Sequence, residues 1–388
     1  MDFDLSEEQQ IIKGAIERLV SDHYGDFERR KTYQKEAGGY SPAIWRDFAE
    51  MGLAGLPFDE ETGGAGGGPV ETMIVMESIG RGLCLEPFLS TVVLSGTALK
   101  LAANEAQTES LVQPMIGGEL TVSLAFTERQ SRYDLFDVAT NARRTDSGYT
   151  INGQKSVVLN GESADRFIVS ARTSGDRRDR NGITLFIVDA KASGVEIHGY
   201  QAQDGGRVAE LTLTDVTVGQ DAVLGQPDQG LPLLEAVIDH GIAAVAAEAV
   251  GAMEALHGLT VEYLQTRKQF GVPIGKFQVL QHDAVNMMVA LEQARSMAMF
   301  AAMSVDAPAK ERGQAMSAVK VQINRSAREV GQLAIQLHGG IGMTMEYKGG
   351  HYFKRLTVIE NLFGDTDYHL ARLTRGNGLL AEMSEDAA

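Results

Sequence analysis

The sequence predicts an α+β protein of several domains: an N-terminal helical domain, a middle β-barrel-like domain and a C-terminal four-helix bundle. A chain of 388 residues exceeds one ordinary hydrophobic core. Alternating and β-branched runs are confined to the middle third, whereas helical apolar periodicity prevails before and after it. Strands do not alternate with helices, which disfavours a doubly wound dinucleotide-binding sheet. We place the domains at residues 1–119, 120–226 and 227–388.

The N-terminal third carries two clear helix starts. Ser6 and Gln9 have the spacing of a capping box at the head of an amphipathic helix. Ser41-Pro42 predicts an N-cap followed by a first-turn proline. The glycine run 63–68 lacks the Gly-Lys-Ser/Thr ending of a P-loop and does not fit G-x-G-x-x-G, so we interpret it as a flexible loop. Further helices are expected from 69 to about 117.

The middle third predicts a small β domain. Strands are expected at 121–126, 150–151, 156–159, 167–171, 184–188 and 208–213. Asn-Gly pairs at 152–153, 160–161 and 181–182 are interpreted as turn signals between them. The segment from Arg172 to Asn181 is dense in charge, and we expect it to be a solvated hairpin tip.

The C-terminal third predicts a bundle of long helices. Four stretches have the required length and apolar periodicity, at 242–264, 279–304, 309–338 and 347–375. The most apolar run, 241–253, is short and is interrupted by Glu248. It therefore suits a buried helix better than a membrane span.

Composition narrows the class of protein. With 44% hydrophobic and 22% charged residues, the chain is an ordinary globular protein. A formal net charge of -17 argues against nucleic-acid and anionic-membrane partners, so an anionic small ligand would need a local basic site. The single cysteine, Cys84, excludes an internal disulfide and a multi-cysteine metal site, and we expect it in the core. The segment Met1–Asp4 has no features of a secretory signal, which predicts a cytoplasmic protein.

Two segments carry candidate chemistry. Between 336 and 343 a glycine pair follows an apolar helical run, which indicates either a helix cap and turn or a close backbone approach to an anion. We expect His338 in this segment to be a packed or capping residue. Between 267 and 278 one long helix ends and another begins. There Arg267 has the donors to grip a pyrophosphate and Phe270 a face for adenine, although a basic last turn complementing the helix dipole explains the charge equally well.

Taken together, the motifs resemble the acyl-CoA dehydrogenase family over essentially the whole chain. The resemblance rests on Arg-Lys-x-Phe-Gly at 267–271 with Phe-Gln at 277–278, and on Gln-x-x-Gly-Gly-x-Gly at 336–342. Further matches lie at 53–57 with its glycine loop, at 152–155, at 211–216 and at 223–225. Within the family, the chain resembles the small-subunit type of two-component pimeloyl-CoA dehydrogenases.

The resemblance implies FAD as cofactor, an acyl-CoA thioester as substrate, desaturation between C2 and C3, and a flavin-linked electron acceptor. No metal is expected, because the eight histidines are scattered without metal-ligand spacing. Residue by residue, the resemblance carries FAD contacts onto Arg267, Gln269, Phe270, Phe277, Gln278, Gln336, Gly339, Gly340 and Thr366.

The catalytic base of the family is absent from its usual place. Matching the family's Tyr-Glu-Gly-Thr to residues 363–366 puts Gly364 at the glutamate position. The family's second base location falls near Gly241, beside Asp239 and His240. Asp365, one residue beyond Gly364, is the remaining candidate.

The flavin-ring segments depart from the family pattern as well. The family's Thr-Glu-Pro-x-x-Gly-Ser-Asp loop keeps only its first two residues and its last in 127–134. The family's Trp-x-Thr/Ser becomes Val157-Val158-Leu159, which lacks the hydroxyl that would bond near flavin N5.

The departures are confined to the segments that would hold the chain's own flavin ring. In the family each FAD is shared across a dimer interface, and here the segments that serve the neighbour's FAD are kept while those for the chain's own flavin ring are altered. We therefore predict a support subunit that works with a homologous partner subunit, as in a heterotetramer. The alternatives are a self-sufficient homo-oligomer with a relocated base such as Asp365 or Asp239, and a non-enzymatic acyl-CoA-binding or scaffold protein.

Overall fold

The computed structural model describes residues 5–377, so the prediction drawn from Met1–Asp4 lies outside the described residues. The chain forms two compact units. One comprises Met1–Arg29, Pro69–Cys84 and Ile242–Ala388, and the other comprises Arg30–Gly68 and Leu85–Gly241. Each unit is thus assembled from segments that are distant in the sequence.

The first unit begins with the predicted capping box. In α1 (Glu7–Tyr24) the Gln9 backbone N–H donates to Ser6 Oγ (3.2 Å), and the Ser6 N–H donates to Gln9 Oε1 (2.9 Å). Helix α1 packs against α4 (Pro69–Gly82). Glycines allow α4 to approach α8 closely, since a Cβ at Gly80 would lie 1.9 Å from the Glu248 carbonyl oxygen.

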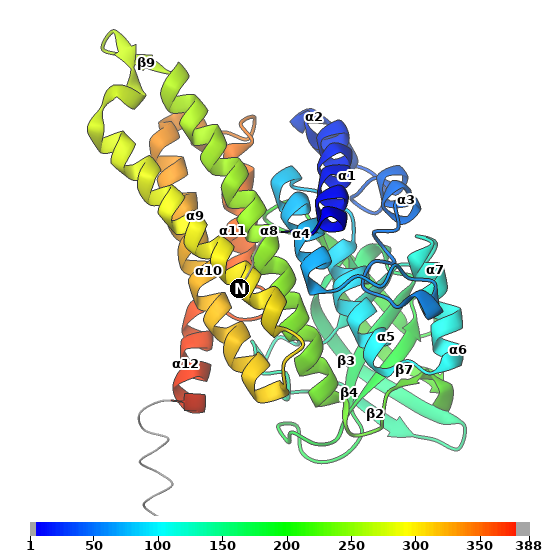
Figure 1. Ribbon diagram of the computed structural model, residues 1–388. Coiled ribbons are helices and arrows are strands. Elements are labelled where there is room, and N and C mark those ends of the chain that lie inside the picture. The colour runs from blue at the N-terminus through cyan, green and yellow to red at the C-terminus, as the bar shows by residue number, and fades with distance from the viewer. Residues whose placement is uncertain (1–4, 378–388) are drawn as a thin grey trace, which may run out of the picture. The chain divides into compact units, whose positions relative to one another are not determined.

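Long helices make up the rest of this unit. They are α8 (Gly230–Thr266), which starts in the other unit, α9 (Gln278–Ser304), α10 (Ala309–His338), α11 (Gly349–Asn361) and α12 (Thr366–Asn377). Figure 1 shows α9, α10 and α11 running alongside one another, and α10 contacts α9, α11 and α12. The prediction of one helix over 347–375 was wrong, because the chain breaks at 362–365, where Gly364 has a φ of +120°.

The second unit contains the predicted β domain. Its sheet has eight strands in the order β6-β7-β3-β2-β4-β5-β8, with β1 paired to β4. The strands are β1 (Val122–Ala125), β2 (Asn141–Arg144), β3 (Gly148–Leu159), β4 (Arg166–Arg172), β5 (Ile183–Asp189), β6 (Val195–Gln201), β7 (Arg207–Gly219) and β8 (Val223–Leu224). Buried aromatic and aliphatic side chains such as Phe167, Phe186 and Leu213 form its core.

Short helices accompany the sheet. They include α3 (Pro42–Glu50), α5 (Gly96–Ala102), α6 (Glu105–Gln107) and α7 (Gln113–Ile116), whereas α2 (Phe27–Tyr33) crosses the unit boundary. Helix α3 starts as predicted, with Ser41 as its N-cap and Pro42 in its first turn. Two π-helical segments, Phe88–Ser95 and Thr108–Val112, lie next to α5 and α7.

Two local predictions need correction. Asn152-Gly153 is no turn, because β3 runs through it as one strand with a register shift between Ile151 and Gly153. A Cβ at Gly153 would lie 2.5 Å from Thr140 Oγ1, so glycine here permits a close approach rather than a reversal. The glycine run 63–68 is also less free than predicted, since the N–H groups of residues 64–67 all donate to backbone carbonyls between 55 and 59.

Candidate functional site

The segment 267–278 forms an exposed β-hairpin between two long helices. Strands β9 (Lys268–Gln269) and β10 (Val272–Pro273) pair across Phe270 and Gly271, whose φ values of +52° and +82° are those of a tight two-residue turn. The Ile274 N–H closes the hairpin on the Arg267 carbonyl (2.8 Å). Sequence alone suggested only a helix-to-helix turn here.

The side chains predicted to bind the cofactor are free to do so on this hairpin. Phe270 is 90% exposed and lies edge-on to Phe277, with ring centroids 6.1 Å apart. Arg267, Gln269 and Gln278 are exposed, and among residues 5–377 the Arg267 guanidinium has no carboxylate partner. Large aromatic rings in solvent are unusual unless a ligand or a protein covers them.

The Gly339-Gly340 pair ends α10 in an open position. Gly339 has a φ of +60°, and its N–H still donates to the carbonyls of the preceding turn. A Cβ added at either glycine would meet nothing within 4 Å. The positive φ therefore requires glycine at 339. Both Gly339 and Gly340 are exposed, so a ligand can approach their backbone closely.

His338 ties this glycine pair to the hairpin. Its buried imidazole stacks between Tyr263 and Tyr347, with ring centroids 4.7 and 4.9 Å away. Nδ1 lies 2.8 Å from the Ala334 carbonyl and Nε2 lies 2.8 Å from Tyr347 Oη. Burial lowers the pKa of His338, so the ring is a neutral packed residue, as expected from the sequence. Tyr263 lies one helical turn before Arg267, so the stack joins the two sequence-distant segments.

A polar groove runs between α10 and the start of α12. Its volume is about 720 Å³, within the range of small-molecule sites. Gln336 and Thr366, both predicted FAD contacts, line it together, and Arg325 and Arg328 contribute positive charge. Further lining residues are Asn286, Glu329, Gln332, Leu333, Asp367 and Leu370.

The base position is occupied by a tight turn. Phe363 and Gly364 have φ values of +61° and +120°, and Asp365 then caps α12 by accepting the Tyr368 N–H at Oδ1 (2.8 Å). The Asp365 carboxylate is thus engaged in starting a helix. At the second location Asp239 is buried in α8, and His240 Nδ1 contacts the Ala236 carbonyl (2.9 Å).

Behind this turn lies a buried polar cluster that sequence reasoning missed. Lys320 Nζ donates to Asn324 Oδ1 (2.9 Å) and to the carbonyls of Ile359 (2.6 Å) and Glu360 (3.2 Å). Burial lowers its pKa to about 7. His369 is fully buried as well, and its pKa is lowered to about 3 by burial and by the nearby Lys320 and Arg372. The sequence did offer a signal for this cluster: Lys320 falls three residues after Ser317, on the apolar face of a predicted helix.

The surviving residues of the flavin-ring loop have a structural role in the second unit. Lys155 Nζ donates to Glu128 Oε1 (2.7 Å) and Ser170 Oγ (3.0 Å), and both charges are buried. Burial raises the pKa of Glu128, but Lys155 and the surrounding hydrogen bonds outweigh this effect and lower the pKa to about 2. Glu128 also accepts the Ala139 N–H (2.8 Å) and therefore anchors the loop.

Val157 lies where the family pattern has a tryptophan and is conformationally unusual. Its φ is +53°, in a register shift of β3, and its side chain is 46% exposed. A β-branched residue in the left-handed region is an outlier. Beside it, Ser156 Oγ donates to Glu210 Oε2 (2.9 Å), and Tyr200 Oη donates to Oε1 of the same carboxylate (3.0 Å).

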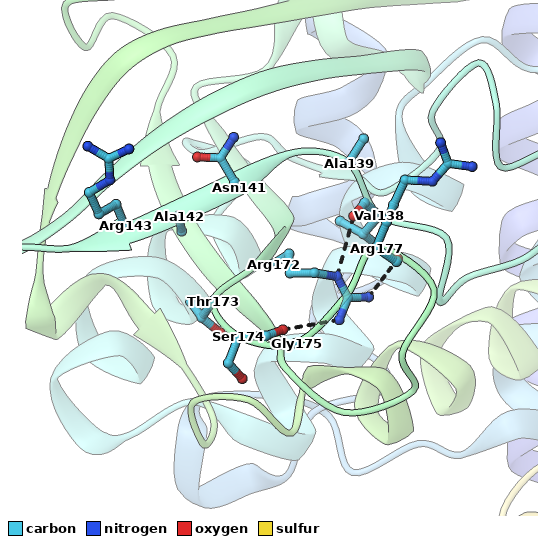
Figure 2. A pocket seen from close by; sticks show the side chains of 10 residues that line it. All are labelled: Val138, Ala139, Asn141, Ala142, Arg143, Arg172, Thr173, Ser174, Gly175 and Arg177. Carbon is cyan, nitrogen blue, oxygen red and sulfur yellow. Dashed lines mark hydrogen bonds between the residues drawn. The ribbon is translucent and has the colours of Figure 1, made fainter.

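The charged loop after β4 is organised by a buried arginine, not solvated throughout as predicted. Arg172 donates to the carbonyls of Val138, Phe136, Ser174, Arg177, Asp179 and Asn181 at 2.8–3.4 Å. Figure 2 shows it beside a cavity of about 430 Å³ that Arg143 and Arg177 also line. Sequence reasoning missed this role, because nothing in the pattern separates Arg172 from the exposed arginines that follow.

Within residues 5–377 no group of three or more His, Cys, Asp or Glu side chains is arranged to hold a metal ion. No helix in the same part of the chain is long and apolar enough to cross a membrane. Cys84 is half-buried and forms no disulfide, so its expected place in the core is only partly met.

Family models match the chain in three consecutive blocks. The acyl-CoA dehydrogenase N-terminal domain matches residues 6–119, the middle domain residues 123–216 and the C-terminal domain residues 228–377.

Individual proteins agree with the family match. The 3-(aryl)acrylate reductase of Clostridium sporogenes is 32% identical over 81% of this chain and 85% of its own length. The solved structure of butyryl-CoA dehydrogenase from Megasphaera elsdenii has a TM-score of 0.87 at 26% identity and covers 97% of this chain and 99% of its own. A structure of the Tcur3481-Tcur3483 steroid ACAD, in a variant form, has a TM-score of 0.86 at 26% identity, with 98% and 99% covered.

Proposed function

Because this chain belongs to the acyl-CoA dehydrogenase family of FAD-dependent oxidoreductases, we propose that it is the support subunit of a heteromeric acyl-CoA dehydrogenase. In this role it lends its ADP-binding half to an FAD whose ring lies in a homologous partner subunit. The type it resembles is the small subunit of pimeloyl-CoA dehydrogenase. When bound, FAD supplies the hydride acceptor for C2–C3 desaturation of the acyl-CoA.

The exposed hairpin is the observation that carries the proposal. Arg267 has paired N–H donors without a carboxylate partner among the described residues, which suits a pyrophosphate. Phe270 and Phe277 present faces for an adenine ring. Gly339 and Gly340 leave open space at their backbone, which suits a phosphate oxygen. The residues present therefore fit the ADP half of FAD.

The groove between α10 and α12 supports the same assignment. Gln336 and Thr366 bring amide and hydroxyl groups to a cavity of about 720 Å³. Arg325 and Arg328 bring positive charge to the groove, where Glu329 and Asp367 also lie and Arg328 pairs with Glu360, so Arg325 is the cation there with which an anionic ligand would pair. Gln336 and Thr366 would orient the ligand, Arg325 would balance its negative charge, and none of these side chains would transfer a proton.

The chain's own catalytic apparatus is incomplete on the same reading. Gly364 provides no carboxylate, Asp365 is engaged as a helix cap, and Leu159 offers no hydroxyl. A base must lie within hydrogen-bond reach of the proton that it removes, and the family position holds none. The partner subunit would have to supply it.

A protein partner is supported by an apolar stripe along α9. Val285, Met288, Val289, Phe300 and Met303 are exposed at spacings that place them on one helix face. We call these five residues the α9 stripe. The stripe has two apolar patches, at 285–289 and at 300–303, with the exposed Glu292 and Ser296 between them, and exposed apolar side chains gathered on one face are typical of protein interfaces.

The first test is to express the chain alone and together with a homologue that carries the family glutamate. We expect little flavin in the chain alone and an FAD-containing complex on co-expression. Stoichiometric flavin in the chain alone that bleaches with an acyl-CoA would instead support a self-sufficient enzyme with Asp365 or Asp239 as its base.

A matched pair of variants tests the hairpin. Arg267→Ala should raise the Kd for FAD of the assembled complex by roughly tenfold, the effect of losing one charge-assisted contact of about 1.4 kcal/mol, and so lower the FAD content of the purified complex. Lys276→Ala removes an exposed cation from the same turn and should leave the FAD content unchanged. An unchanged content in both variants would favour a scaffold protein without flavin.

A further inference from the structure

The turn at residues 363–366 is closed from within by the side chain of His369. A Cβ built on Gly364 would lie 2.5 Å from His369 Nε2 and 2.9 Å from His369 Cδ2. Real Cβ atoms essentially never approach other atoms so closely, so one of the two groups would have to move. The family's glutamate therefore cannot be introduced at position 364 in this conformation.

His369 has little freedom to move aside. Its imidazole is fully buried on α12, Nε2 donates to the Phe363 carbonyl (3.0 Å), and Nδ1 lies 3.2 Å from Ser317 Oγ on α10. One bond holds the turn and the other contact reaches the neighbouring helix. A core of this density transmits displacement rather than absorbing it.

Tyr368 also approaches position 364, with Cδ1 2.6 Å from the added Cβ. Its ring is only partly buried, at 5.2 Å from the His369 ring and 5.9 Å from the Arg372 guanidinium carbon. Of the two neighbours, His369 is the fully buried one. The restriction on position 364 therefore has two sources, the φ of +120° and the fixed His369 ring.

We propose that His369 is a positioning residue that holds the Phe363–Thr366 turn against α10 and, together with the positive φ at 364, restricts that position to glycine. Thr366, which faces the groove with Gln336, is placed by this turn. The missing glutamate is therefore one part of a turn whose packing differs as a whole. A side chain at 364 would also require a smaller residue at 369. The proposed role of His369 does not depend on the proposed support function. Only the interpretation of the missing glutamate as a loss of catalysis in this chain rests on that function.

The experiment is a double-variant cycle on the full chain, read as the midpoint of thermal unfolding. Gly364→Ala should lower the midpoint by roughly 5 °C or more, from backbone strain and the clash together. In a His369→Ala background the same change should cost less than half as much. His369→Val, which is also smaller than histidine, serves if His369→Ala does not fold.

Two controls separate the clash from other effects. Gly63→Ala introduces a side chain at a φ of +85° with nothing within 4 Å, so it shows the cost of a left-handed backbone without a clash, and the change in the cost of Gly364→Ala across the His369→Ala background isolates the clash. In a Tyr368→Ala background the cost of Gly364→Ala should persist. An equal cost with and without His369, or relief by Tyr368→Ala instead, would overturn the proposal. The cycle needs neither FAD nor a partner, so its outcome is independent of the test of the proposed function.

Discussion

The His338 imidazole stacks on the Tyr263 ring at a centroid distance of 4.7 Å, and this contact joins the end of α10 to the last turns of α8. Arg267 follows Tyr263 by one helical turn, and Gly339 follows His338 directly. The stack therefore sets the relative position of the two segments proposed to bind the ADP half of FAD.

Removing the ring from this stack should weaken cofactor binding without touching a ligand-facing residue. We expect Tyr263→Ala to raise the Kd for FAD of the assembled complex by roughly tenfold, about 1.4 kcal/mol, because the two segments lose their common anchor. Tyr263→Phe keeps the ring and should bind like the parent. Fluorescence titration of apoprotein with FAD measures both, and equal loss in the two variants would mean that the hydroxyl matters rather than the stack.

The buried Glu128–Lys155 pair makes the second unit sensitive to loss of one charge. Glu128→Gln should reduce the free energy of unfolding by about 3–5 kcal/mol, since the Lys155 ammonium would remain buried without its counter-charge. Replacing both residues, as in Glu128→Leu with Lys155→Met, should recover much of that loss. Urea unfolding of the single and double variants tests this, and a double variant as unstable as the single one would contradict it.

Val157 is a position where a glycine should stabilise the fold. Its left-handed backbone costs a β-branched residue about 1–2 kcal/mol, so Val157→Gly should raise the free energy of unfolding by roughly 0.5–1 kcal/mol after the entropy cost of glycine. The neighbouring Val158 is buried, and Val158→Gly should destabilise the protein. Equilibrium denaturation compares them, and destabilisation in both would show that the Val157 side chain itself is needed.

Acid should destabilise the first unit through its buried histidines. Burial lowers the pKa of His369 to about 3 and also lowers that of His338, so below pH 6.5 the unfolded chain binds more protons than the folded chain. The stabilisation is complete above about pH 6.5 and is lost as the pH falls toward 3, by a few kcal/mol for His369.

His369→Leu should flatten this pH dependence because it removes one of the titrating groups. His282 is exposed, and His282→Asn should leave the pH dependence as it is. Unfolding free energies measured between pH 4 and 7 distinguish the two variants, and an unaltered slope in His369→Leu would contradict the assignment.

Local signals in the sequence predicted the helices well where caps were strong. The capping box at Ser6 and Gln9 formed as expected, and the predicted helix 309–338 coincides with α10, which lies between Pro308 and Gly339. The sequence also predicted correctly that the middle third forms a β domain. The Asn152-Gly153 bulge was mistaken for a turn because the same dipeptide serves both, and only the partner at Thr140 decides between them.

For the candidate site as well, local motifs could be predicted from the sequence, whereas exposure and burial could not. The motifs identified Arg267, Phe270 and Gly339, but periodicity carries no information on exposure, so their openness to a ligand emerged only from the fold. The burial of Lys320 and His369 depends on contacts between α10, α11 and α12, which no local pattern encodes. The break before α12 did have a local signal, Gly364 followed by the helix-capping Asp365, which the prediction of one helix over 347–375 overlooked.

The α9 stripe bears on how much of this chain a cell can accumulate. Five large apolar side chains on one helix face, with Phe270 beyond them, make an uncovered chain a target for chaperones and proteases and a seed for aggregation. We expect chain made in excess of the proposed partner subunit to be degraded or to precipitate, so that its steady-state amount follows the supply of that subunit.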